Sequence, residues 1–329
     1  MVDAPVVDAP VTDAAVDAPA DAMLDASPDS MLMPDAMVDA GADARVDAMP
    51  DAMVDAAADA MVDAAPDAPV APFMGAMPIG LAQDPLVIDD DPTLTADLLE
   101  LYFNRLGDVY VARRTAVGAA FSTPVRVNEV SSASDETRPE ITGDGLYMLV
   151  ASDRPGGVGG HDIWMSSRAS RSAAWSIPVR VPEVSSAADD AGATPTDDKL
   201  AVVVSSQRDI VTGELYLSTR ATTADAFGPL VRITNDMIEE SSPMLSQDKL
   251  TVYFDVINGP GGPGGDDIYQ LSRATTASAF GTIADFVPVA GLNTTADEGD
   301  VWISPDGRHA AFVSNRTIPT FYMIYEADR

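Results

Sequence analysis

The sequence predicts an all-β fold, a five-bladed β-propeller of four-stranded blades, preceded by a disordered tail rich in Asp and Ala. From Phe73 onward, short runs of Val, Ile, Tyr, Phe and Trp are separated by Gly, Pro and Asp, which is typical of many short strands. These runs recur about every fifty residues, with no helical pattern between them, and four strands per repeat at this period indicate propeller blades.

Residues 1–72 are a tract of Asp-Ala units that we expect to be a disordered acidic spacer. From Asp35 to Asp67 an Asp stands at every fourth position and Ala follows each one. This period is close to that of a helix, but like charges four residues apart repel each other and repeated prolines break helices. The tract's 16 Asp and single Arg extend the chain by repulsion. A helical stalk and a calcium-binding tract are the alternatives.

Five copies of the repeat can be aligned. Each consists of an acidic pair, a short strand, a turn, an apolar strand, a loop, an aromatic strand and an aromatic-x-x-Pro outer strand. The second copy runs from Asp135 to Arg168 and closes with Trp175-Ser176-Ile177-Pro178. Its turn, Asp144-Gly145, is a hairpin signal. We expect Trp175 and its equivalents to clamp the outer strands.

The two ends of the repeat region complement each other. The fifth copy stops at Arg329 without an outer strand, whereas Phe73–Ile79 matches the outer-strand pattern of Phe121–Val125. We therefore expect the N-terminal strand to complete the last blade and close the ring, which removes open sheet edges. The predicted organisation is a spacer over residues 1–72 and a propeller over residues 73–329.

The recurring pattern Pro-x-x-Ser/Thr-x-Asp-Gly, then Ser-x-Arg, then Asp-Ile-Tyr/Trp resembles the TolB-like, WD-repeat-like family of β-propellers over residues 73–329. This resemblance implies a protein-binding role in the periplasm or at the cell surface. The acidic tract resembles the linkers that follow the lipobox in exported bacterial lipoproteins. It implies an exported, lipid-anchored protein of the cell envelope or extracellular surface. The signal segment is not present in this sequence, since MVDAPVVDAP has neither a basic nor an apolar signal region.

Composition excludes several classes of function. With 52 acidic residues, 19 Lys and Arg and a net charge of −33, the chain is a poor partner for nucleic acid or for anionic membrane surfaces. The absence of Cys excludes disulfides and thiolate zinc sites. With two histidines in the sequence, His161 and His309, a His-based metal site or a Ser-His-Asp triad is nearly excluded. No apolar run is long enough to span a membrane, and we expect a monomer.

The candidate binding residues lie on one predicted face. In propellers, the loops from an outer strand to the next inner strand share a face with the loops between second and third strands. The Gly-rich loops Pro155–Gly160 and Gly259–Gly265 are placed there with an acidic pair from each copy. The pairs are Asp90/Asp91, Asp135/Glu136, Asp189/Asp190, Glu239/Glu240 and Asp297/Glu298. In every copy except the fourth, an Arg stands at the end of the second strand. These residues are Arg105, Arg154, Arg208 and Arg316.

Two interpretations of these charges are open. They are structural ion pairs that tie loops together, each contributing about 0–1 kcal/mol, or the carboxylates bind a basic ligand or a cation such as Ca²⁺. No other cofactor is expected. The fourth copy has acids without an Arg, so we expect the most negative potential there. The candidate ligand-binding residues are the acidic pairs of copies two to five together with Arg154, His161 and Asp266, while His309 is expected to cap its hairpin.

We predict a non-enzymatic binding or scaffold propeller that recognises protein or carbohydrate through the face with the Gly-rich loops. The alternative is a carbohydrate-active enzyme, similar to a glycoside hydrolase, with carboxylates in the central funnel. A catalytic acid should depart from its repeat, as Asp255, Asp266 and Glu140 do. A unique acid pair about 5–10 Å apart in the funnel would favour the enzyme, and repeated acids beside arginines would favour the scaffold.

Overall fold

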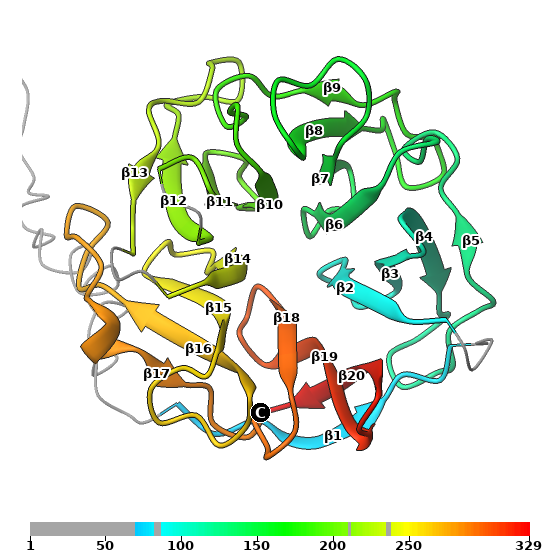
Figure 1. The fold of residues 1–329 in the computed structure, drawn as a ribbon. Coiled ribbons are helices and arrows are strands. Elements are labelled where there is room, and N and C mark those ends of the chain that lie inside the picture. The colour runs from blue at the N-terminus through cyan, green and yellow to red at the C-terminus, as the bar shows by residue number, and fades with distance from the viewer. Residues whose placement is uncertain (1–69, 82–86, 210–211, 235–237) are drawn as a thin grey trace, which may run out of the picture. The chain divides into compact units, whose positions relative to one another are not determined.

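The computed structural model describes residues 70–81, 87–209, 212–234 and 238–329. Over these residues the chain forms the predicted propeller, a ring of five four-stranded antiparallel sheets (Figure 1). The predicted spacer, up to residue 69, lies outside the described residues. Within the described part of the chain, no helix is long and apolar enough to cross a membrane.

The blades follow one another along the chain, and the first strand of each lies nearest the axis (Figure 1). Blade one consists of β2 (Asp89–Leu94), β3 (Glu100–Arg105), β4 (Asp108–Arg113) and β5 (Val125–Arg126). Blade two consists of β6 (Glu136–Ile141), β7 (Tyr147–Ser152), β8 (Asp162–Ser167) and β9 (Val179–Arg180). Blade three consists of β10 (Asp190–Pro195), β11 (Ala201–Ser206), β12 (Glu214–Thr219) and β13 (Val231–Arg232). Blade four consists of β14 (Glu240–Leu245), β15 (Thr251–Ile257), β16 (Asp266–Ser272) and β17 (Val287–Pro288). Blade five consists of β18 (Glu298–Ile303), β19 (His309–Ile318), β20 (Phe321–Asp328) and the N-terminal β1 (Met74–Pro78).

The predicted closure of the ring is confirmed. Strand β1 pairs antiparallel with β20, so the last blade contains both ends of the repeat region. Phe73 is buried at 2% exposure, and the Arg329 guanidinium lies 4.3 Å from the centre of its ring. Because such a stack combines cation–π attraction with buried apolar area, it holds the N-terminal segment on the final blade.

The same clamp recurs in every blade, as predicted for Trp175 and its equivalents. An Arg directly after the third strand stacks on the aromatic residue that precedes the outer strand, at 4.3 to 4.5 Å from the ring centre. The other four pairs are Arg114–Phe121, Arg168–Trp175, Arg220–Phe227 and Arg273–Phe280.

The outer strands are shorter than the aromatic-x-x-Pro pattern predicts. In blade two the pattern ends at Pro178, and β9 is the dipeptide Val179–Arg180 that follows it. Proline cannot donate a ladder hydrogen bond, so the pairing begins after it. In blade four a 3-10 helix, Ile283–Asp285, lies ahead of β17.

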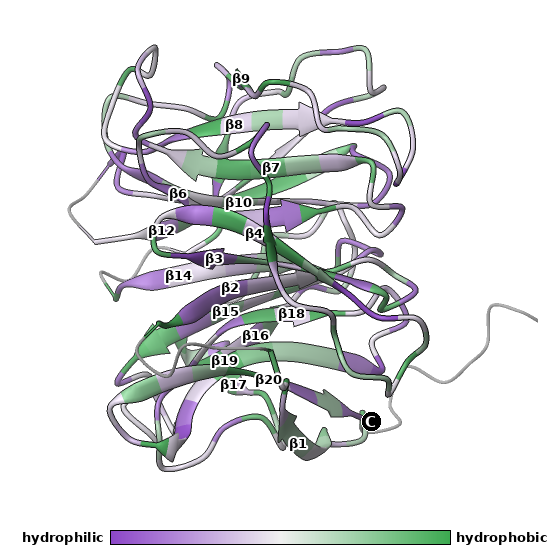
Figure 2. Cartoon of the chain, turned by 90° about the vertical axis from the view of Figure 1, so that its right-hand side faces the viewer, coloured by the Kyte–Doolittle hydropathy of each residue, from purple (hydrophilic) through white to green (hydrophobic). Residues whose placement is uncertain are grey.

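Apolar side chains fill the space between neighbouring blades. The second and third strands are mostly hydrophobic, as β7 and β8 show in Figure 2. Between blades one and two, for example, Tyr102, Ile141 and Trp175 belong to one buried cluster. This face-to-face packing fixes the five inner strands around the axis, where the candidate site lies.

Candidate functional site

The first residue of each inner strand is an acid that is fully buried. In blade two, Arg154 lies 2.9 Å from a carboxylate oxygen of Glu136, and the hydroxyls of Ser132 and Ser152 also donate to that carboxylate. The interaction joins the inner strand to the preceding loop and to the second strand. The five acids are Asp89, Glu136, Asp190, Glu240 and Glu298.

The arginines of these pairs make two further structural contacts. Arg154 and Arg208 donate to the carbonyl oxygens of Val130 and Val184, at 2.7 and 2.9 Å. Their guanidinium groups also stack on third-strand aromatics, as Arg154 does on Trp164 at 5.2 Å. Arg316 repeats the arrangement with Glu298. This geometry favours the structural interpretation of Glu136, Asp190, Glu298 and Arg154, and ligand binding by them stays a prediction.

The fourth blade departs from this pattern, as its sequence predicts. Asn258 follows its second strand where the other blades have Arg. The buried Glu240 accepts a hydrogen bond from the Thr234 hydroxyl at 3.0 Å. The preceding acid, Glu239, is exposed.

The other first members of the pairs lie against the preceding blade. Asp189 accepts a 2.7 Å hydrogen bond from the backbone N–H of His161, and its carboxylate lies 2.9 Å from the His161 ring nitrogen Nδ1. Asp297 accepts the backbone N–H of Asp266 at 3.2 Å. Asp135 differs, since its backbone N–H donates to Asp153 of its own blade. His161 therefore has a carboxylate partner, rather than lying free in its loop.

Blade one corrects the predicted register by two residues, since Asp91 was aligned with Glu136. The acid equivalent to Glu136 is Asp89, which forms a bidentate pair with Arg105 at 2.5 and 2.7 Å. Asp90 and Asp91 therefore stand outside the repeat. Three consecutive Asp residues gave the alignment no basis for choosing among them, and strand pairing in three dimensions makes the choice.

These two displaced acids belong to a cluster on the propeller axis. Carboxylate oxygens of Asp90, Asp91 and Asp300 all lie within 4.8 Å of one another. The backbone N–H of Asp300 donates to Asp255 at 3.2 Å, and Asp255 is 4% exposed. Arg138 reaches into the same region, where its backbone N–H donates to Asp91 at 2.9 Å.

A repeated backbone irregularity directs side chains to this place. The pairing register shifts within each inner strand, and four residues at the shift have positive φ. In non-Gly residues this conformation costs about 1–3 kcal/mol each, and it is concentrated at functional sites. These residues are Asp91 (53°), Arg138 (47°), Ser242 (48°) and Asp300 (48°), and Gly192 has the corresponding position in blade three.

Burial and mutual repulsion raise the pKa values of the acids in and around this cluster. Burial, followed by the charge of Asp300, raises the pKa of Asp91 to about 7 even though Arg138 opposes the shift. The same two causes raise the pKa of Asp255 to about 6. Burial raises the pKa of Glu140 well above its usual value. Asp266 is also affected, with a pKa raised to about 8 by burial and then by Asp255 and Asp300.

The space beside the cluster is small. Asp91, Arg138, Glu140, Ser242 and Asp300 line a cavity of about 10 Å³, together with residues of β10 and β14. A volume of this size holds about one water-sized particle. The site therefore accommodates an ion or a water molecule and is too small for a sugar ring.

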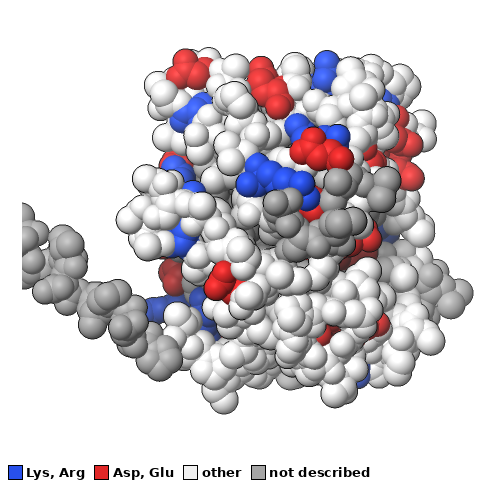
Figure 3. Space-filling view, turned by 60° about the vertical axis from the view of Figure 1, so that its left-hand side comes forward, with Lys and Arg blue, Asp and Glu red and all other residues white. Residues whose placement is uncertain are grey.

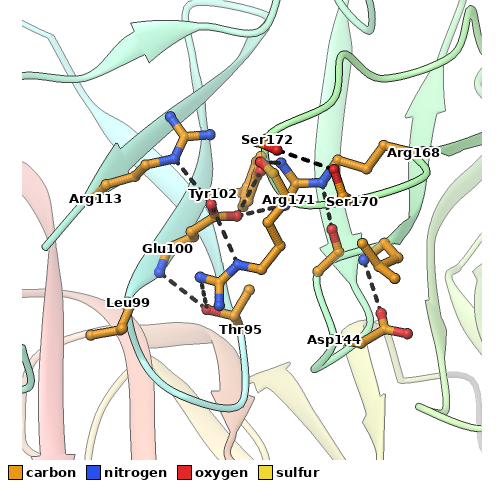
Figure 4. A network of polar contacts seen from close by, with 12 residues as sticks. Thr95, Leu99, Glu100, Tyr102, Arg113, Asp144, Arg168, Ser170, Arg171 and Ser172 are labelled. Atoms are coloured by element: carbon orange, nitrogen blue, oxygen red, sulfur yellow. Dashed lines mark hydrogen bonds and ion pairs between the residues drawn. The ribbon is translucent and has the colours of Figure 1, made fainter. Parts of the chain in front are cut away.

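Another acid outside the repeat, Glu100, is surrounded by arginines instead of carboxylates (Figure 4). Glu100, on β3, is 4% exposed and lies 3.0 Å from Arg113, 2.6 Å from Arg168 and 3.5 Å from Arg171. Burial acts to raise its pKa, but hydrogen bonds from Arg168 and Arg113 outweigh burial, so the pKa lies below its usual value. This acid is fully paired and stabilises the contact between blades one and two.

The sequence reasoning found part of the axial cluster. It named Asp255, Asp266 and Glu140 as departures from the repeat, and the structure brings them near Asp300. It missed Asp300 and Arg138 as axial residues. Aligning the copies on Asp89 would have shown both, because they then share a position with Asp91.

His309 differs from its predicted role. Its side chain is 5% exposed, and its ring nitrogen Nδ1 lies 2.7 Å from Asp328. The turn is capped instead by Ser304, whose hydroxyl accepts the backbone N–H of His309 at 2.8 Å. The reason is register, since His309 begins β19 and points toward β20.

Exposed apolar side chains lie in the loops between second and third strands or at the strand ends beside them. Leu106 is 78% exposed, Val158 52%, Ile257 56% and Ile318 47%, and they come from blades one, two, four and five. The outer surface seen in Figure 3 looks different, since Lys and Arg lie there beside Asp and Glu.

Comparison with known proteins identifies the fold alone. No protein-family model matches the chain, and the search of curated proteins gives no match. Among solved structures, native arabinanase Arb43A of Bacillus subtilis is 14% identical with a TM-score of 0.52, covering 78% of this chain and 96% of that chain. A thermostable family-43 glycoside hydrolase is 13% identical with a TM-score of 0.51, covering 74% and 89%. A putative TolB from Agrobacterium tumefaciens is 16% identical with a TM-score of 0.45, covering 69% and 70%.

Proposed function

We propose that this propeller is a non-enzymatic recognition module that binds a protein partner through the loops between its second and third strands. The observation that carries this proposal is a set of exposed aliphatic side chains in or beside four of these loops. Leu106 and Val158 lie in loops, and Ile257 and Ile318 are the last residues of second strands. Contiguous exposed apolar patches mark interaction sites, and we infer that these four side chains contribute to one such patch.

The shape of these loops supports recognition. Leu106 is 78% exposed although its backbone has a φ of 54°, a conformation that costs free energy in a non-Gly residue. Asp162 accepts the backbone N–H groups of Val158 and Gly159 at 2.7 and 3.2 Å. Asp267 holds the other Gly-rich loop through the N–H of Gly264 at 3.0 Å. Loops fixed in this way lose less entropy on binding.

A carbohydrate-active enzyme is the second candidate function, because the axial acids depart from the repeat and have raised pKa values. The geometry favours it less. A glycosidase needs its two carboxyl groups about 5 to 9.5 Å apart with a sugar between them. Here the oxygens of Asp90, Asp91 and Asp300 lie within 4.8 Å of one another, and the adjoining cavity measures about 10 Å³.

Site-specific photo-crosslinking tests the recognition proposal. A crosslinking amino acid at Val158 should capture a defined protein partner from envelope extract, and Leu106→Asp should weaken that capture. The matched control carries the crosslinker at Val125, which is 59% exposed on outer strand β5. Equal capture from both positions would contradict recognition through the loop face. Binding on a glycan array without protein capture would assign the face to carbohydrate, and release of reducing sugar that Asp91→Asn abolishes would establish the enzyme instead.

We further propose that the module works at the cell envelope or extracellular surface, attached through a lipid anchor. The support is the composition of residues 1–72 and the repeat pattern that resembles TolB-like propellers. Cell fractionation of the native host, with metabolic labelling by a fatty acid, tests both points. Recovery of unlabelled protein in the cytoplasmic fraction would contradict them.

A further inference from the structure

All five blades contribute to one place on the axis. The cavity there is lined by Asp91 of β2, Arg138 of β6, Gly192 of β10, Ser242 of β14 and Asp300 of β18. Hydrogen bonds connect these positions around the ring: Ser242 donates to Asp300, and Arg138 lies 3.3 Å from the Ser242 hydroxyl. The site is therefore built by the closed ring and by no single blade.

Negative charge at this place exceeds positive charge. Asp91, Asp300 and Glu140 line the cavity, and among its described lining residues Arg138 is the one cation. The arginine divides its donors, since it lies 3.7 Å from Asp91 and also donates to the carbonyl oxygen of Ala191 at 3.0 Å. Asp90 and Asp255 add two further carboxylates around the same centre.

A second observation, independent of the cluster itself, indicates a missing ligand. Glu140 lines this cavity, and its Oε2 atom is inaccessible to solvent and has no hydrogen-bond partner among the described residues. Asp266, which is not among the residues that line the cavity, also has a buried oxygen, Oδ1, with no hydrogen-bond partner among the described residues. A buried carboxylate oxygen without a donor is costly, and a cation would satisfy it.

The dimensions fit a hard cation. Calcium binds six to eight oxygen ligands at about 2.3–2.6 Å, so two ligands on opposite sides of the ion are about 4.6–5.2 Å apart. The oxygens of Asp90, Asp91 and Asp300 lie within 4.8 Å of one another. The smaller Mg²⁺, at about 2.0–2.1 Å, requires a tighter octahedron.

We propose that the propeller axis is a binding site for one calcium ion, with Asp90, Asp91 and Asp300 as carboxylate ligands and Glu140 and Asp255 completing the acidic surroundings. Asp91 and Asp300 belong both to the triad and to the cavity, so the ion lies against these two. The proposal does not depend on the recognition function.

The ligands come from blades one and five, which gives the ion a structural consequence. Asp90 and Asp91 stand on β2 and Asp300 on β18, at the junction between the first and the last blade. Blade five is also the blade that the N-terminal strand completes. Calcium would therefore join the two ends of the propeller at its centre, while the Phe73–Arg329 stack joins them at the rim.

The test uses the full chain, freed of metal with a chelator and then titrated with calcium chloride alone. The acidic tract offers its own carboxylates, so variants are needed to locate the binding. Asp91→Asn with Asp300→Asn removes two ligands, and the matched control, Glu129→Gln with Glu183→Gln, removes the same charge from exposed positions. Calcium at 100 times its Kd should raise the melting temperature of the wild type and the control by about 5–10 °C, and should leave the axial variant unchanged.

Three outcomes would overturn the site: no shift in the wild type, the same shift in the axial variant, or equal affinity for calcium and magnesium. If the double variant fails to fold, calorimetric titration of Asp90→Asn replaces it. Loss of one ligand should weaken calcium binding by at least about 10-fold, and an unchanged affinity would equally reject the proposal.

Discussion

Two buried groups of charges in this propeller differ in their ratio of arginines to carboxylates. At Glu100, one carboxylate is surrounded by three arginines, and its pKa is lowered. On the axis, several carboxylates share Arg138, and the pKa values of Asp91 and Asp255 are raised. The difference shows that a buried carboxylate stabilises this fold where arginines surround it. Where carboxylates outnumber arginines, their mutual repulsion destabilises the fold.

The largest expected loss of stability comes from removing the carboxylate of Glu100, which three arginines surround. Glu100→Gln removes the charge that faces Arg168, whose side chain is 1% exposed. An uncompensated buried guanidinium should lower the free energy of unfolding by about 3–5 kcal/mol. Urea denaturation measures the change, and Glu183→Gln, at an exposed position, is the control. A loss no larger than that of the control would show that the three arginines do not depend on Glu100.

The next effect comes from removing the single axial cation. Arg138→Gln should lower the free energy of unfolding by about 2–3 kcal/mol in chelator, because a charged hydrogen-bonding group is lost beside several acids. Added calcium should restore most of that loss, since the ion supplies the missing positive charge. Urea denaturation with and without calcium measures both values, and equal losses in the two conditions would argue against axial repulsion.

Removing an axial acid is expected to stabilise the protein, in contrast to removing Arg138. Asp255→Asn removes one of the repelling charges and leaves a side chain that can still accept the N–H of Asp300. In chelator it should raise the free energy of unfolding by about 1 kcal/mol. Thermal unfolding of the metal-free proteins provides the measurement. A destabilised variant would show that Asp255, like Glu100, contributes to stability through its contacts.

The smallest effect concerns His309, whose cation can be removed by pH. Burial acts to lower its pKa, but hydrogen bonds with Glu326 and Asp328 outweigh burial, so the folded pKa is raised above 6.5. A raised pKa gives stability that is complete below the unfolded pKa and is lost as pH rises through the folded pKa. His309→Gln should therefore cost up to about 1 kcal/mol near pH 5.5 and less near pH 9. Melting curves at the two pH values test the sign, and a larger loss at pH 9 would reverse it.

Much of the architecture was predictable because each repeat carries its own signals. The turn of blade two shows why, since the hydroxyl of Thr142 contacts Asp144 at 2.6 Å, as Ser304 contacts Asp306 in blade five. Such local contacts depend on residues two apart, and the sequence displays them directly. The structural pairing of Glu136 with Arg154 could be inferred in the same way from its recurrence.

The axial cluster was harder to predict because it depends on register. The run Asp89–Asp91 allows three registers, and each register assigns a different residue to the position that Arg138 and Asp300 have in their blades. The positive φ of Asp91 and Asp300 adds a local change of direction that no residue type announces. Asp255 and Glu140 were recognisable as departures from the repeat, but their neighbours were not.

The sequence by itself determined the blade number, the strand order and the closing role of Phe73–Ile79, because periodicity and turn chemistry are local properties of the chain. The tertiary structure alone decided which acids meet. Asp91, Arg138 and Asp300 are far apart in sequence, and they meet because five inner strands converge on one axis. Their burial and mutual distance, which set their charge, exist only after the ring has closed.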